Sequence, residues 1–281
     1  MATSSSSRVI ALLGGHLDEY QRFLDASSSL LDSHVSRILT ELNDVAVQDA
    51  LHGMSIGTTK GRSPPASAKS FEEELSSALI LFMECALDEE VTKGNKDSID
   101  RILELTAAVT GSQTSVKVVK TVLERVILFT KVVLERLRSG ACRFIGIVVA
   151  QLMKQSQVNA YAVLLDQASQ ALLPCFTDKS QAVRQAAVEA SGSFFTSQTT
   201  HPDLLQALLY AAQHDPSVAI RVAAVRSLPV TLETLDRILS RVRDIKPKVR
   251  VAALQVVQQQ AWDMLEPEHC VALIELGMTN R

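Results

Sequence analysis

An aspartate followed six residues later by an arginine occurs three times, in the segments DKSQAVRQAA, DPSVAIRVAA and DIKPKVRVAA. The aspartates are Asp178, Asp215 and Asp244, and the arginines are Arg184, Arg221 and Arg250. Opposite charges at a spacing that recurs with the fold can pair in its interior. We therefore predict a structural ladder in which each arginine pairs with an aspartate of its own or an adjacent unit. For Arg221 the expected partner is Asp215.

Two further groups of basic residues could bind phosphate groups. The first surrounds one turn and contains Arg241, Arg243, Lys246 and Lys248, and the second contains Arg136, Arg138 and Arg143. Such side chains neutralise the phosphates of a nucleic acid without reading its bases. We predict that both groups bind the DNA backbone, and the alternative is that they form an ordinary solvated surface.

Most motifs that carry catalysis are absent from the sequence. It contains no G-x-x-x-x-G-K-[ST], G-x-G-x-x-G or H-E-x-x-H pattern. Its one G-x-S-x-G match, Gly53–Gly57, lies in a Gly/Ser/Pro-rich stretch and not between a strand and a helix. Its 6 histidines are scattered, without cysteine or acidic neighbours at metal-ligand spacing. We expect a protein that is not an enzyme, with no catalytic residue, bound metal or cofactor.

The repeated segments have the pattern of amphipathic helices. In the third copy, apolar residues at helical spacing form one stripe, made of Val249, Ala252, Ala253, Val256 and Val257. We expect each aspartate to lie in the turn before such a helix, with Asp215 capping its helix start. An apolar partner helix is expected upstream of each, over residues 161–176, 204–213 and 232–242, with another over 267–276. The unit is then a helix–turn–helix.

Stacked helical pairs of this kind are typical of HEAT repeats, and a repeat array offers a long surface to partners. The aspartates are spaced 37 and 29 residues apart, and a weaker copy lies upstream at Ala141-Cys142-Arg143. The composition is 47% apolar and only 4% aromatic, which suits packed Ala, Leu and Val helices. We predict an all-α fold, a HEAT-repeat α-solenoid that forms a superhelix of antiparallel helix pairs.

Three regions are expected along the chain. Residues 1–52 should form an amino-terminal helical segment with a disordered tip, residues 53–70 a flexible Gly/Ser/Pro-rich linker, and residues 71–281 the repeat array. Helices are expected at 71–87, 98–109 and 116–138 before the clear repeats begin. We predict that the array is truncated at its carboxy-terminal end, because Thr279-Asn280-Arg281 corresponds to the inner turn of a unit whose second helix does not follow. No apolar run is long enough to span a bilayer.

Charge is distributed unevenly between the two parts of the chain. Residues 1–110 carry 9 Lys and Arg against 17 Asp and Glu, whereas residues 111–281 carry 19 against 14. The excess of positive charge in the second part indicates a polyanionic partner.

Several segments resemble the HEAT-repeat G subunit of condensin, also called condensin subunit 3. They are CFTDKSQAVRQAAVEA, DPSVAIRVAA and LPVTLETLDRILSRVRDIKPKVRVAALQV, with weaker similarity at Phe71–Leu75, Ser98–Val109, Gly140–Phe144 and the final ALIELGMTNR. The resemblance covers about residues 70–281 and rests partly on the 37-then-29 spacing. It does not extend to residues 1–70 or to the long carboxy-terminal remainder of that family.

The resemblance implies a non-enzymatic subunit that binds the kleisin subunit of condensin and, through a basic groove, double-stranded DNA independently of its sequence. It also implies association with the SMC subunits through the complex, support of mitotic chromosome condensation, and a nuclear and chromosomal location with a cytoplasmic pool. The alternative is a scaffold or cargo adaptor, similar to nuclear transport receptors or phosphatase scaffolds, that binds proteins only. A membrane adaptor is disfavoured because no basic amphipathic helix is clear.

Overall fold

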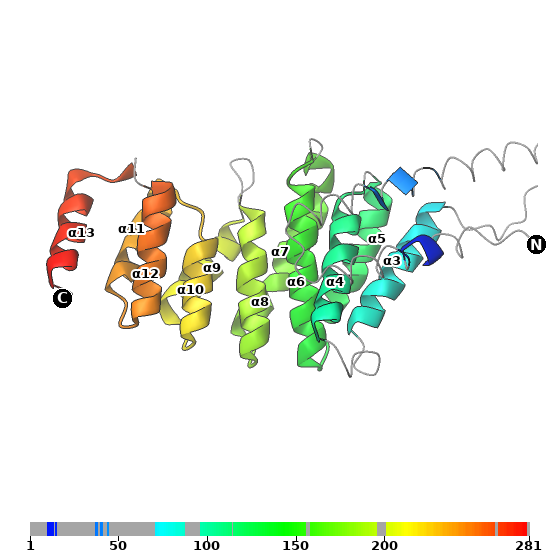
Figure 1. Ribbon diagram of the computed structural model, residues 1–281, viewed down its shortest axis with the longest axis horizontal. Coiled ribbons are helices and arrows are strands. Elements are labelled where there is room, and N and C mark those ends of the chain that lie inside the picture. Colours follow the sequence, from blue (N-terminus) through cyan, green and yellow to red (C-terminus); the bar gives the residue numbers. More distant parts are fainter. Residues whose placement is uncertain are drawn as a thin grey trace, which may run out of the picture. The chain divides into compact units, whose positions relative to one another are not determined.

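The computed structural model describes residues 10–13, 15, 37–38, 40–41, 44, 71–87, 96–113, 115–155, 158–195, 201–261 and 264–279. Every regular element in this described part of the chain is helical (Figure 1). The prediction of an all-α, HEAT-like fold of packed helix pairs is therefore confirmed. The expected linker at 53–70 and most of the expected segment at 1–52 lie outside the described residues.

The chain divides into two compact units, Met1–Leu165 and Asp166–Arg281. The helices of the first are α3 (Phe71–Leu87), α4 (Lys96–Gly111), α5 (Val116–Phe129) and α6 (Glu135–Leu152). Helix α4 packs against α3 and α6, and α3 also packs against α5. Three glutamates lie in the first turn of α3, where the positive end of the helix dipole stabilises them.

The prediction of a single helix over 116–138 is wrong, because the chain breaks between α5 and α6. At the end of α5 the hydroxyl of Thr130 donates to the carbonyl oxygen of Ile127 at 2.8 Å, an alternative to continued helical bonding. Helix α6 then starts at Glu135, and the Arg138 side chain binds carbonyl groups of the intervening turn. The break is stabilised by side-chain contacts that helical periodicity does not reveal.

A short 3₁₀ helix, η1 (Val158–Tyr161), precedes α7 (Ala162–Leu172), which spans the sequence boundary between the units. The other elements of the second unit are η2 (Leu173–Thr177), α8 (Gln181–Ser191), η3 (Gly192–Phe194), α9 (Pro202–His214), α10 (Val218–Ser227), α11 (Leu232–Ser240), η4 (Arg241–Arg243), α12 (Pro247–Val256), η5 (Val257–Ala261) and α13 (Pro267–Thr279). The expected helix–turn–helix units correspond to α7 and η2 with α8, α9 with α10, and α11 with α12.

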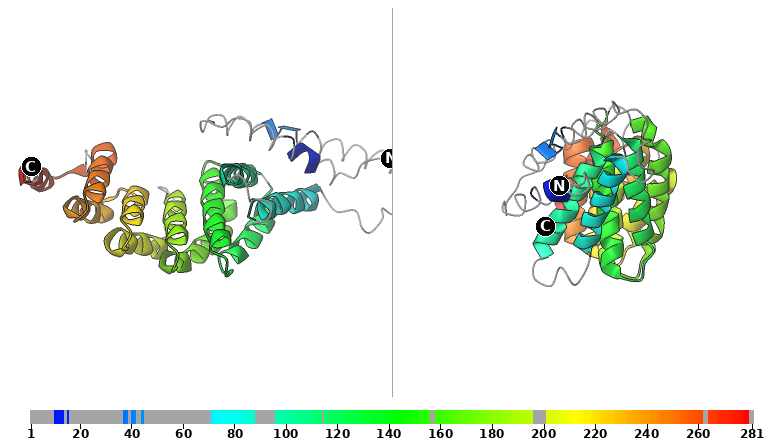
Figure 2. Two further views of the ribbon diagram at one scale, coloured as in Figure 1. Left: turned by 60° about the horizontal axis from the view of Figure 1, so that its bottom comes forward. Right: turned by 90° about the vertical axis from the view of Figure 1, so that its right-hand side faces the viewer.

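The apolar positions of the repeated segment form the core of this second unit. The sixth-place residues Val183, Ile220 and Val249 have 0% exposure. The tenth-place alanines 187, 224 and 253 are equally inaccessible. Small side chains at that place let adjacent helices approach closely. Helix α10 accordingly packs against α8, α9 and α12. The left view of Figure 2 shows these helices following one another along the unit.

Candidate nucleic-acid interface

Each repeated aspartate fixes the turn in which it lies. The carboxylate Oδ1 atoms of Asp178, Asp215 and Asp244 accept a backbone N–H two residues later, at 2.8, 2.8 and 2.9 Å. The N–H groups belong to the residues just before α8, α10 and α12, so the expectation that Asp215 itself caps α10 needs correction. Ser217 is the N-cap residue, and Asp215 instead orders the turn before it.

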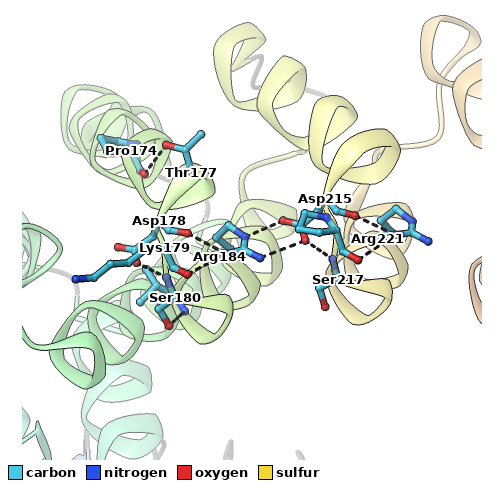
Figure 3. A network of polar contacts seen from close by, with 11 residues as sticks. Pro174, Thr177, Asp178, Lys179, Ser180, Arg184, Asp215, Ser217 and Arg221 are labelled. Atoms are coloured by element: carbon cyan, nitrogen blue, oxygen red, sulfur yellow. Dashed lines mark hydrogen bonds and ion pairs between the residues drawn. The ribbon is translucent and has the colours of Figure 1, made fainter.

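The first rung of the ladder joins two successive repeats. Arg184 on α8 donates from Nε to Oδ2 of Asp215 at 2.8 Å and from Nη2 to Oδ1 at 3.4 Å. Its Nη1 atom donates to the carbonyl oxygen of Asp178 at 2.9 Å (Figure 3). One guanidinium therefore ties the turn of its own repeat to the turn of the next.

The second rung corrects the expected partner of Arg221. Its Nε and Nη2 atoms donate to the carboxylate of Asp244, at 3.2 and 3.1 Å. Towards Asp215 it makes only a bond to the backbone, from Nη1 to the carbonyl oxygen at 2.9 Å. The carboxylate of Asp215 already accepts hydrogen bonds from Arg184. Because Arg221 binds the aspartate of the following repeat instead, each of these buried charges has a partner.

Arg250 repeats only half of this pattern. Its Nη1 atom donates to the carbonyl oxygen of Asp244 at 3.1 Å. Within the described part of the chain, no carboxylate accepts a bond from it.

The carboxylate of Asp244 lies beside two arginines, Arg221 and Arg241. Burial alone would raise its pKa, but the hydrogen bonds from Arg221 and from the Lys246 backbone, with the charges of Arg221 and Arg241, outweigh that effect. The pKa of Asp244 is therefore lowered from its ordinary value.

Arg241 is predicted to lie outside the ladder as a phosphate-binding residue, and the structure corrects this assignment. Its Nη1 atom lies 3.8 Å from Oδ2 of Asp244, and its side chain is only 20% exposed. The i,i+3 spacing of the two residues is a signal of this pairing that the sequence contains. Grouping Arg241 with its neighbours by charge alone overlooks that spacing.

The rest of this basic turn projects into solvent. Arg243, Lys246 and Lys248 are exposed, and no described residue pairs with their side chains. The backbone beneath them is held by Asp244, whose amide donates to the carbonyl oxygen of Arg241 at 3.0 Å. These three cations, which we call the basic turn, form a positive surface beside the ladder.

The second predicted basic group lies on α6 and is less available. Arg138 is 7% exposed and donates to the carbonyl oxygens of Val132 and Val133, which argues against the predicted role of this residue in phosphate binding. The Arg138 guanidinium instead stabilises the turn before α6 through these two hydrogen bonds. Arg136 and Arg143 are half-buried, and each already takes part in a polar or electrostatic interaction.

Other kinds of site were also sought among the described residues. No cluster of three or more His, Cys, Asp or Glu side chains there could hold a metal ion. None of the described helices is both long and apolar enough to cross a bilayer.

A protein-family model described as sister chromatid cohesion protein PDS5 matches residues 68–265. The chain belongs to this family. The PDS5 match covers α3 to η5, and therefore the whole ladder and the basic turn. No curated protein sequence matches the chain.

A solved structure shares the fold of this PDS5-family chain. It is the crystal structure of the Schizosaccharomyces pombe condensin Cnd3–Cnd2 subcomplex, with a TM-score of 0.63 and 19% sequence identity. The match covers 97% of this chain and 30% of the matched one, so the chain spans less than a third of that protein's length. At this identity the likeness establishes a shared helical fold.

Proposed function

We propose that the chain is a non-enzymatic HEAT-repeat module of a condensin-type chromosome complex, in which it grips the backbone of double-stranded DNA and binds the kleisin subunit. The observation that carries the DNA part is the contrast between neighbouring cations. Arg184, Arg221 and Arg241 are committed to carboxylates, whereas Arg243, Lys246 and Lys248 are exposed on an ordered turn. Exposed cations that no carboxylate neutralises suit a phosphate backbone.

The test is a salt titration of duplex binding by the wild-type chain and by the triple variant Arg243→Glu, Lys246→Glu and Lys248→Glu. Affinity for two duplexes of unrelated sequence should fall about equally, because bonds to phosphate carry no base information. The slope of log affinity against log salt should flatten by about 0.9 for each phosphate that the variant no longer neutralises.

A charge-matched control separates this turn from a general charge effect. Lys131, Arg226 and Arg237 are exposed and lie outside the basic turn, so changing all three to Glu alters the net charge by the same amount. The control should retain most of the affinity and the slope. Equal losses in the two triple variants would overturn the proposed interface, and absence of duplex binding by the wild-type chain would favour a scaffold that binds proteins only.

The proposal has two alternative kleisin partners, because the fold match is to a condensin subunit and the family match is to a cohesion protein. The fold match to a condensin subcomplex and the sequence resemblance favour a condensin kleisin, whereas the PDS5 family match favours a cohesin kleisin. Co-expression with fragments of each kleisin, followed by affinity purification, distinguishes them. Retention of the condensin kleisin alone supports the first variant, retention of the cohesin kleisin alone supports the second, and retention of neither contradicts both.

Such a subunit would act in the nucleus and on chromosomes, with a cytoplasmic pool, and would meet the SMC subunits through the complex. The structure suits a mechanical role. The Arg184–Asp215 and Arg221–Asp244 pairs join consecutive repeats through side chains that are at most 15% exposed, and they would help the array to resist a force along it. DNA held at the basic turn would thereby be coupled to the stacked helices.

A further inference from the structure

A groove of about 890 Å³ crosses helices α8, α10 and α12 of the second unit. Only Lys248 belongs to both this groove and the basic turn. Arg184 and Arg221, near the starts of α8 and α10, bind the aspartates in the turns before α10 and α12, and Arg226 near the end of α10 binds Gln255 near the end of α12. The helices therefore run parallel, and Figure 1 shows them side by side.

Helix α10 supplies the floor of the groove with small and apolar side chains. Ile220 and Ala224 face the core with 0% exposure, while Val218, Ala219, Val222 and Ala223 line the groove and keep access to solvent. The helix is thus apolar on two faces. On α12, Val251 extends the same surface and is 52% exposed. A helix with a second apolar face that its own fold leaves uncovered is typical of a binding surface.

We propose that this groove binds an amphipathic helix of a partner protein. Small residues on a helical floor let another helix approach to about 8–10 Å between axes. A ten-residue helix such as α10 is about 15 Å long, so the bound segment would have about three turns. Its apolar stripe would follow the i, i+3, i+4, i+7 pattern of helices that dock in grooves.

Charge sets the direction of the bound helix. The amino-terminal ends of α10 and α12 meet at the end of the groove where Lys248 is exposed, so the helix dipoles and the lysine make this end positive. At the opposite end the carboxy-terminal dipoles are accompanied by Glu189 and Arg226. A helix that runs antiparallel to α10, with an acidic residue in its last turn beside Lys248, complements both ends.

The experiment selects displayed single-helix peptides on the folded 281-residue chain. One library has a randomised apolar stripe at i, i+3, i+4 and i+7, and a matched library has the same positions restricted to polar residues. The first library alone should yield binders, with an acidic residue enriched in the last turn. If neither library is enriched, or if the polar library is enriched equally, the proposal is wrong.

Variants of the groove floor then locate the binding site. Ala219→Gln with Ala223→Gln fills the floor with neutral side chains and should weaken the selected peptides at least tenfold. The exposed pair Ala160→Gln and Ala162→Gln is the matched control and should leave their affinity unchanged. If the double floor variant has a lowered melting temperature, Ala219→Gln alone serves, because Ala219 is exposed. Equal affinity for floor and control variants would overturn the proposal.

A charge exchange tests the direction of the bound helix. Lys248→Glu should weaken a peptide with a terminal acid, and replacing that acid with lysine should restore binding to the variant. Absence of rescue would contradict the antiparallel arrangement.

Sedimentation of the chain alone tests whether a second copy of the chain occupies the groove. A dimer that the floor variants abolish would show self-association and would overturn the proposal of a partner helix. None of these outcomes depends on DNA or kleisin binding.

Discussion

The guanidinium of Arg221 binds the carboxylate of Asp244, 23 residues further along the chain, through two nearly equal hydrogen bonds of 3.2 and 3.1 Å. The exposed fractions of the two side chains are 9% and 5%. The pair joins the start of α10 to the turn before α12. Arg184 and Arg221 thus each hold their own turn by the backbone and the next turn by the carboxylate.

Replacing Arg221 with Ala should lower the free energy of unfolding by about 3–5 kcal/mol, because the buried carboxylate of Asp244 is left without its principal partner. Urea-induced unfolding followed by circular dichroism measures this change. Arg226→Ala is the control on the same helix, since Arg226 is exposed and its Nη2 atom donates to Oε1 of Gln255 at 3.2 Å. A destabilisation of less than about 1 kcal/mol for Arg221→Ala would show that the ladder contributes little to stability.

The stability contributed by Asp244 should depend on pH in the acid range. Its pKa is lower in the folded chain than in the unfolded chain, so its stabilising contribution is present above the ordinary aspartate value of about 3.9 and is lost as the pH falls through the folded pKa. The difference in unfolding free energy between wild type and Asp244→Asn should therefore shrink below about pH 4. Glu233→Gln, which changes an exposed acid of the same repeat, is the control. A difference that stays constant from about pH 7 to about pH 2.5 would contradict the assignment.

Arg138→Ala should destabilise the chain without changing its affinity for DNA. The variant leaves the carbonyl groups of Val132 and Val133 without their charged donor, at a cost of about 1.5–3 kcal/mol for each charge-assisted hydrogen bond removed. Thermal unfolding and a duplex-binding isotherm on the same preparation check both statements. Weakened DNA binding with an unchanged melting temperature would instead support Arg138 as a phosphate ligand.

Gly111→Ala should destabilise the first unit by about 1–3 kcal/mol, because the added methyl group overpacks the interface of α4 with α6. A Cβ atom at Gly111 would lie 2.7 Å from the carbonyl oxygen of Val148, and a backbone atom cannot easily move away. Gly192→Ala is the matched control, since the nearest atom to its added Cβ would be in the Ser227 side chain, at 3.2 Å. Unfolding of both variants in urea should show a clear destabilisation only for Gly111→Ala, and equal stabilities would mean that α4 and α6 can separate at small cost.

The sequence by itself determined the helical units. The recurring apolar residues of the repeat are inaccessible in the structure, and the helices of the second unit match the expected ranges to within a few residues. This agreement arises because helical periodicity and turn residues are local properties of the chain. Helical periodicity does not predict the break between α5 and α6, because the break depends on hydrogen bonds from the Thr130 and Arg138 side chains to backbone carbonyl groups.

Only the tertiary structure decided which charge meets which. Sequence spacing pairs Arg221 with Asp215, yet stacking of the repeats brings Arg221 to the carboxylate of Asp244. The same stacking draws Arg241 into the ladder, whereas Arg243, Lys246 and Lys248 stay exposed. These basic residues look alike in the sequence, but burial decides which of them form ion pairs. A buried cation requires a fixed acceptor, whereas an exposed cation does not.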